Sequence, residues 1–179
     1  AATMALVLGI DPGSRKTGFG IVSVLKGKPT YVTSGVIRLP VHEPLAPRLA
    51  VLFENLNAII NEYSPEQAAI EEVFMARSAG AALKLGQARG AAMVACVSRN
   101  MVVHEYSARA IKQAVVGTGA ATKEQVQHMV KTLLNLPGEP AEDAADGLAA
   151  ALCHAHTSQG LGALVTSPMR RGRLRSSGL

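Results

Sequence analysis

Residues 6–13 read Leu-Val-Leu-Gly-Ile-Asp-Pro-Gly, an apolar run that ends on one acid and a turn. The five residues before Asp11 are apolar or glycine, with β-branched residues prominent among them, which predicts a strand buried on both faces. Burying an ionised acid is costly unless a cation compensates its charge. We therefore expect a lysine or a metal ion beside Asp11, or a cleft where the strand ends.

Three later acids also stand among apolar or small residues. Glu71 ends a predicted strand over 67–71, and Asp143 and Asp146 share a face of a predicted helix because they are three residues apart. Two carboxylates at the ends of adjacent strands would converge with two more from a helix packed across them. Such hard oxygen ligands favour Mg²⁺ or Mn²⁺, and two such ions on a phosphate can activate water and stabilise the leaving oxygen.

These features also have plain structural interpretations. Asp-Pro-Gly at 11–13 is a good turn by itself, and Asp143 suits the N-terminal dipole of its helix. Gly13 and Gly18 have the glycine spacing of a phosphate-binding loop, but the Lys-Ser/Thr pair that should follow is missing. The turn and the close packing of the second strand explain these glycines better.

The composition predicts a single domain in a reducing compartment. The 179 residues are 48% hydrophobic and 17% charged, which suffices for one sizeable core. The sequence has no apolar run of membrane-spanning length and no secretory signal, and its two cysteines, Cys96 and Cys153, are interpreted as small buried residues. We therefore expect a cytoplasmic protein with no membrane partner. A net charge of +5 suits a polyanion, although many proteins are mildly basic.

Hydrophobic periodicity and turn residues predict an alternation of strands and helices. Strands are expected over 5–11, 18–25, 30–39, 67–71 and 101–104, and helices over 45–63, 78–99, 107–115, from 122 onward, and over 141–157. An antiparallel meander followed by helix-crossover strands makes an α/β fold with a mixed sheet. The predicted domain spans 4–159, and the basic Gly- and Ser-rich tail over 160–179 is predicted to be disordered.

Four segments together resemble a known family. They are LGIDPGSRKTGFGIV at 8–22, AIEEVFMARSAGAALKLGQARG at 69–90, VVGTGAATKEQVQHMV at 115–130 and EDAADGLAAALCHAH at 142–156. In this order they resemble the bacterial RuvC-type Holliday junction resolvases, the crossover junction endodeoxyribonucleases, over about residues 6–159. The resemblance is specific because four separate motifs occur in the family's order.

The resemblance implies a fold and an activity. The fold is ribonuclease H-like, a mixed five-stranded sheet with helices on both faces. The activity is that of a homodimeric endonuclease, which resolves four-way DNA junctions in homologous recombination and repair. It nicks two opposed strands in a metal-dependent, paired reaction that leaves ligatable 5′-phosphate and 3′-hydroxyl ends. The implied cofactor is Mg²⁺, two ions per active site with Mn²⁺ as a substitute, and a branch-migration motor complex is an implied partner.

The resemblance also implies roles for single residues. The family's metal-ligating acids match the four that stand out above: Asp11, Glu71, Asp143 and Asp146. Lys112 matches a basic residue of the catalytic site, Lys123 one on the DNA, and Phe74 an aromatic that meets unstacked bases. Further candidate phosphate contacts are Arg77, Lys84 and Arg89. The bland alternatives are solvated surface charges for the basic residues and a core position for Phe74.

Two other functions compete with this one. A non-catalytic DNA-binding module of the same fold would not need the acids, and all four are present. An actin-like ATPase or sugar kinase also opens on Gly-Ile-Asp-x-Gly, but it needs two such domains and 179 residues are too few. Four histidines, at 104, 128, 154 and 156, are predicted to be structural or surface groups, with His128 nearest DNA. Small residues from Gly86 to Ala92 would allow close packing within the chain or across a dimer.

Overall fold

The computed structural model describes residues 4–73 and 76–161. Its elements are β1 (Ala5–Asp11), β2 (Lys16–Leu25), β3 (Lys28–Arg38), α1 (Leu45–Tyr63), β4 (Gln67–Glu72), α2 (Ala79–Val97), β5 (Val102–Ser107), α3 (Ala108–Val116), α4 (Lys123–Leu133) and α5 (Glu142–Leu161). Each predicted helix and strand is present, with some ends shifted. The predicted domain end at 159 falls inside α5, and residues 162–179 of the predicted tail lie outside the described residues.

The five strands form one mixed sheet in the order β3-β2-β1-β4-β5. β2 pairs antiparallel with β1 and β3, whereas β4 pairs parallel with β1 and β5. The predicted meander and the predicted adjacency of the first and fourth strands are therefore confirmed. β1 lies at the centre of the sheet, which explains why its side chains are apolar on both faces.

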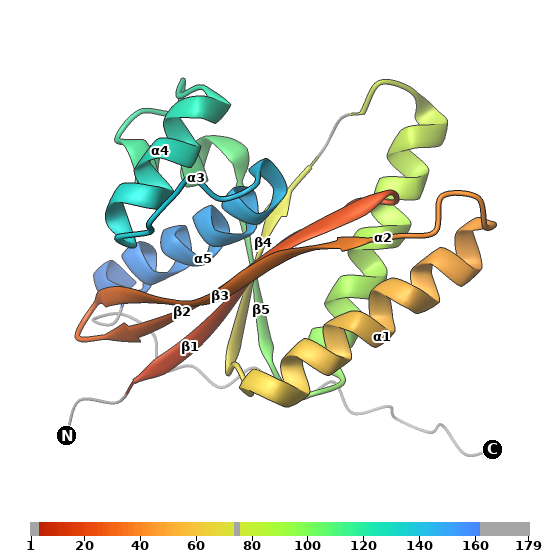
Figure 1. The fold of residues 1–179 in the computed structure, drawn as a ribbon, viewed down its shortest axis with the longest axis horizontal. Coiled ribbons are helices and arrows are strands. Elements are labelled where there is room, and N and C mark those ends of the chain that lie inside the picture. The colour runs from red at the N-terminus through yellow and green to blue at the C-terminus, as the bar shows by residue number, and fades with distance from the viewer. Residues whose placement is uncertain (1–3, 74–75, 162–179) are drawn as a thin grey trace, which may run out of the picture.

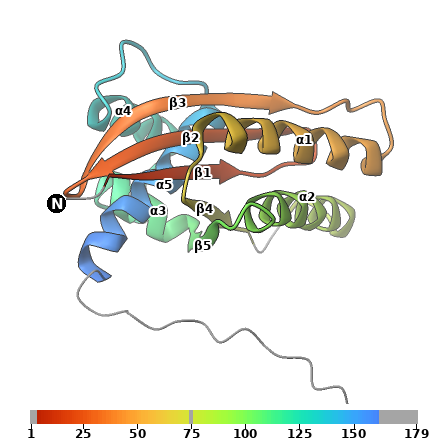
Figure 2. The same ribbon diagram turned by 90° about the horizontal axis from the view of Figure 1, so that it is seen from below.

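Helices cover both faces of the sheet. Figures 1 and 2 show α3, α4 and α5 on one side and α1 and α2 on the other. Alternate residues of β1 feed the two cores, since Val7 packs with the α5 side and Leu8 and Ile10 pack with the α1 and α2 side. The predicted arrangement of helices on both faces is confirmed.

Side chains and glycine cap the ends of several helices. The Ser78 side chain accepts a hydrogen bond from the Ala81 N–H at 3.1 Å, and Thr122 and Gln125 form a reciprocal capping box at the start of α4. Gly117 ends α3 with φ of +92°, a left-handed conformation that glycine adopts without strain. In the described residues, no helix combines the length and apolar character that crossing a bilayer requires.

Buried polar groups near α5 have structural partners. His154 is 4% exposed; its Nε2–H donates to Gln67 Oε1 at 2.5 Å, and its Nδ1 accepts from the Tyr106 hydroxyl at 2.5 Å. Burial lowers the pKa of His154 to about 4, so the ring stays neutral and keeps this tautomer. The prediction that His154 is structural is confirmed, as is the prediction that Cys96 and Cys153 are buried free thiols.

Glycines let α5 lie almost directly on the sheet. A Cβ at Gly9 of β1 would stand 1.8 Å from the carbonyl oxygen of Gly147, and one at Gly18 of β2 would stand 1.8 Å from the carbonyl oxygen of Asp143. Both distances are far inside van der Waals contact, so only glycine fits at either position. The predicted role of the glycines in close packing is confirmed, and this packing sets the height of α5 above β1.

Gly9→Ala is therefore expected to destabilise the fold by about 3 kcal/mol or more, because its methyl group would push against helix backbone and not against a flexible side chain. Chemical denaturation monitored by circular dichroism would measure the loss. The matched control is Gly138→Ala, where an added Cβ meets nothing within 4 Å and the φ is ordinary. Equal stability of the two variants would contradict the close-packing argument.

Candidate active site

The parallel pairing of β1 and β4 sets two acids side by side. The last paired residues of the two strands are Ile10 and Ile70, and Asp11 and Glu71 each follow directly after them. Because side chains alternate along a strand, both carboxylates project to the face that carries Val7 and Ala69. That face is the one covered by α5.

The first turns of α5 bring the other two acids to the same edge. Gly18 packs against the backbone of Asp143, and Gly9 packs against Gly147, so Asp146 is held over the end of β1. The two helical acids differ in their partners. The carboxylate of Asp143 forms a salt bridge with Lys16 Nζ at 2.8 Å, whereas the carboxylate of Asp146 lines a pocket at the sheet edge.

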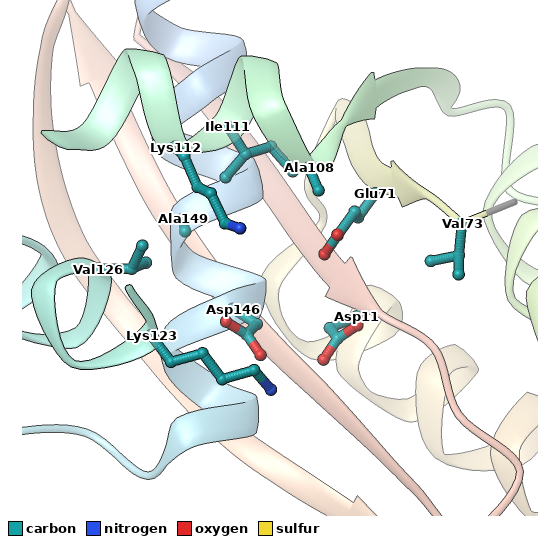
Figure 3. A pocket seen from close by; sticks show the side chains of 10 residues that line it. All are labelled: Asp11, Glu71, Val73, Ala108, Ile111, Lys112, Lys123, Val126, Asp146 and Ala149. Atoms are coloured by element: carbon teal, nitrogen blue, oxygen red, sulfur yellow. The ribbon is translucent and has the colours of Figure 1, made fainter. Parts of the chain in front are cut away.

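Three carboxylates and two lysines line one pocket at this edge (Figure 3). Its lining residues are Asp11, Glu71, Val73, Ala108, Ile111, Lys112, Lys123, Val126, Asp146 and Ala149. Figure 3 shows Lys112 and Lys123 reaching toward the carboxylates from α3 and α4. Five elements thus contribute charged groups to one apolar-walled hollow, which is typical of a site that handles a charged ligand.

The carboxylates in this pocket are poor acids. Burial, then the negative charges of Asp146, Glu71 and Asp143, raise the pKa of Asp11 to about 8, while Lys123 opposes the rise. Burial is also the main cause that raises the pKa of Asp146 to about 6 and the pKa of Glu71 above its ordinary value. Each carboxyl therefore holds a proton more tightly than in water until a cation replaces that proton.

This donor set fits a hard divalent cation. The groups that converge are carboxylate oxygens, which Mg²⁺ and Mn²⁺ prefer, and their mutual repulsion favours a cation between them. As the side chains stand in the described residues, no three His, Cys, Asp or Glu groups are close enough to hold one ion together. The fold brings the acids to one pocket without closing them into a finished coordination shell.

The two predicted site lysines differ in their partners. Lys123 Nζ donates to Glu142 Oε1 at 2.5 Å, and this hydrogen bond is the main cause that raises the pKa of Lys123. Lys112 forms no salt bridge within the described part of the chain, and its positive charge favours the ionised form of Glu71. Both amino groups lie where they would offset negative charge on a bound phosphate.

The remaining predicted contacts lie outside this pocket. Arg89 donates to Glu105 at 2.6 Å with only 17% of its side chain exposed, so it already has a partner inside the protein. Arg77 is exposed in the segment before α2, and Lys84 lines a separate pocket with Arg15 and Arg48. Phe74 lies outside the described residues, and its predicted base contact stays a prediction.

Sequence reasoning missed two features of this edge. It did not predict the Lys16–Asp143 salt bridge, nor did it single out Arg15 and Arg48. The available signal was the pair Arg15-Lys16, which follows Asp11 within the motif at 8–22. Two adjacent cations four and five residues after an acid at a strand end indicate that this turn could contribute to the site.

The sequence of this chain matches a family model and many known proteins. A family model described as "Crossover junction endodeoxyribonuclease RuvC" matches residues 7–154. Proteins of that name from Saccharophagus degradans and Teredinibacter turnerae are 59% identical over 172 residues and 60% identical over 162 residues. The first alignment covers 96% of this chain and 99% of the relative, and the second covers 88% and 92%.

The fold of this chain also matches solved structures of junction resolvases. The structure described as T. thermophilus RuvC in complex with Holliday junction substrate matches with a TM-score of 0.82 and 34% identity, over 87% of this chain and 96% of that one. The yeast mitochondrial Holliday junction resolvase Ydc2 matches with a TM-score of 0.61 over 86% of this chain and 80% of that one, but at 12% identity, which shows the shared fold alone.

Proposed function

The chain belongs to the RuvC family of crossover junction endodeoxyribonucleases, and we propose from this membership that it resolves four-way DNA junctions in homologous recombination and repair. The observation that carries the proposal is the convergence of Asp11, Glu71 and Asp146 from three elements on one pocket with two lysines on its wall. A DNA-binding module without catalysis would have no use for partly buried acids held at a cost in charge.

Mg²⁺ is the cofactor we propose, two ions per site, with Mn²⁺ able to substitute. Asp11, Glu71 and Asp146 would hold the ions, and Asp143 would join them if its carboxylate left Lys16. Mg²⁺ bound there would polarise the phosphate and favour ionisation of the attacking water.

The chain's own groups explain the rest of the reaction. The amino groups of Lys112 and Lys123 offset the charge that develops on the phosphate oxygens. Ile111, Val126 and Ala149 form an apolar wall that limits water access to one side of the pocket. Water adds its hydroxyl to phosphorus, the bond to the 3′ oxygen breaks, and that oxygen takes up a proton. The products are a 5′-phosphate and a 3′-hydroxyl, without a covalent enzyme intermediate.

The test is cleavage of a synthetic four-way junction with Mg²⁺. We expect nicks in two opposed strands that DNA ligase can seal, and no cutting of linear duplexes made from the same sequences. A labelled junction resolved on denaturing gels, with and without ligase, measures both. Binding without cutting would identify a non-catalytic module, and hydrolysis of ATP by the purified protein would revive the ATPase alternative.

We also propose that the protein acts as a homodimer through the outer face of α2. Leu83, Val94 and Val97 are 68%, 59% and 59% exposed, and they recur with Gly90 along one face of the helix. The opposite face, with Ala88 and its neighbours, is buried in the core. A large apolar stripe in water favours a partner, and a two-fold dimer would match the approximate two-fold symmetry of a junction.

Val94→Asp is expected to raise the dimer dissociation constant at least about 30-fold, since leaving a charge unpaired in an interface costs roughly 2 kcal/mol or more. Sedimentation equilibrium measures this constant. Val102→Asp is the matched control, because Val102 is equally exposed, at 57% against 59%, but lies on the edge strand β5. A dimer that tolerates Val94→Asp as well as Val102→Asp would exclude the α2 face.

A further inference from the structure

A second, basic pocket lies beyond the turn that follows Asp11. Its lining residues are Ser14, Arg15, Val41, Arg48, Ser78, Gly80, Ala81 and Lys84. They come from the turn after β1, the segment before α1, the first turns of α1 and the first turns of α2. Figure 1 shows α1 and α2 beginning on the same side of the molecule, and this pocket lies between those beginnings.

Three cationic side chains face this pocket, and none has an acidic partner among the described residues. Arg15, Arg48 and Lys84 form no salt bridge within residues 4–73 and 76–161, and no acid is among the residues that line the pocket. Concentrating positive charge in this way is unfavourable in the free protein. An anion from outside would relieve that repulsion.

The pocket is built to keep one of these charges in place. Arg48 Nε donates to the backbone oxygen of Glu43 at 2.9 Å, and its Nη1 donates to the backbone oxygen of Ser14 at 3.3 Å. These bonds fix the guanidinium without neutralising it, so the remaining N–H groups can serve an anion. Arg15 and Lys84 are exposed and can close on the anion from either side.

We propose that Arg15, Arg48 and Lys84 hold one backbone phosphate of the junction DNA, separate from the phosphate that is cut. The proposal rests on the function proposed above and adds a positioning site to it. Arg15 comes four residues after Asp11, and the next residue, Lys16, forms a salt bridge with Asp143 of α5. One short turn therefore links the basic pocket to the carboxylate pocket. A phosphate held here would fix the register of the strand relative to the carboxylates.

Salt dependence of binding tests this site directly. In the Asp11→Asn background, where the junction should stay intact, Arg15→Gln with Lys84→Gln is expected to weaken binding roughly threefold to tenfold at low salt. The plot of log affinity against log salt has a negative slope, and the magnitude of that slope should decrease by about 0.9, the value for one phosphate contact. Lys28→Gln is the control, since it removes one charge at the far end of the β2–β3 hairpin. A slope equal to that of Lys28→Gln would overturn the proposal.

A neutral phosphate analogue identifies the partner. A set of junctions would each carry one methylphosphonate, at successive positions along the strand. At one position the substitution should weaken binding by the protein with the intact pocket but not by the protein with Arg15→Gln and Lys84→Gln. If every position acts equally on both proteins, the pocket does not hold a DNA phosphate. Failure of the proposed function would appear differently, as an absence of cutting by the unmodified protein. Failure of the pocket alone would leave cutting intact and the pocket variants indistinguishable from Lys28→Gln.

Discussion

Asp11→Asn is expected to lower the rate of junction cleavage at least about 10³-fold, since loss of a metal-ligating charge removes several kcal/mol of transition-state stabilisation. Junction binding should change little, because we expect the basic side chains, not Asp11, to contact the DNA phosphates. Asp146→Asn should behave in the same way, since its carboxylate faces the same pocket from α5. Single-turnover cleavage and equilibrium binding on the same labelled junction measure the two quantities.

The matched control for these variants is Glu72→Gln. Glu72 directly follows Glu71 on β4, so its side chain projects to the other face of the strand and lies outside the pocket lining. It should cut at nearly the wild-type rate. If Asp11→Asn retained full activity, Asp11 would not be a ligand, and if Glu72→Gln lost activity, charge near the sheet edge would matter more than pocket geometry.

Much of this site could be predicted because its signal is local. An acid at the end of a run of buried strand residues stands out in any window, as Asp11 and Glu71 do, and Asp146 stands out as an acid among the small apolar residues of a predicted helix. The adjacency of β1 and β4 followed from connection rules, since the other strands of the meander lie to one side of β1. The helix starts followed from capping residues such as Thr122.

The features that escaped prediction depend on contacts between distant segments. The fifth strand was expected to end at 104, but it runs to Ser107 because Tyr106 and Ser107 pair with Glu71 and Glu72 of β4. Asp143 pairs with Lys16 because Gly18 lets α5 touch β2, a distance that no local periodicity encodes. The Arg89–Glu105 ion pair joins α2 to β5, so no local pattern predicts it, and the DNA contact of Arg89 stays a prediction.

Metal binding at this site should be strongly dependent on pH. Burial and the neighbouring carboxylates Asp146, Glu71 and Asp143 raise the pKa of Asp11 to about 8, so an ion must displace a proton at neutral pH. Lowering the pH from 8 to 6 is therefore expected to raise the Mg²⁺ concentration for half-maximal cleavage roughly 50-fold, since about half of the Asp11 carboxyl is ionised at pH 8 and about one part in a hundred at pH 6. Below pH 6 the dependence should steepen, because the pKa of Asp146 is raised to about 6 and a second proton competes.

The same shift has a definite sign for stability without metal. The pKa of Asp11 is about 8 in the folded protein and near 3.8 when unfolded, so the folded state binds more protons between these values. Stability from this group is therefore full at low pH, falls as the pH rises toward 8, and is constant above that. Calorimetry in a chelator should show the fall for the wild type and a weaker fall for Asp11→Asn, and Mg²⁺ should raise Tm more at pH 8 than at pH 6.

The Mg²⁺ concentration that cleavage requires is measured as the midpoint of a Mg²⁺ titration at each pH, because the cleavage rate itself varies with hydroxide concentration. A midpoint that does not move with pH would show that no proton leaves when the ion binds, and that Asp11 is not a ligand.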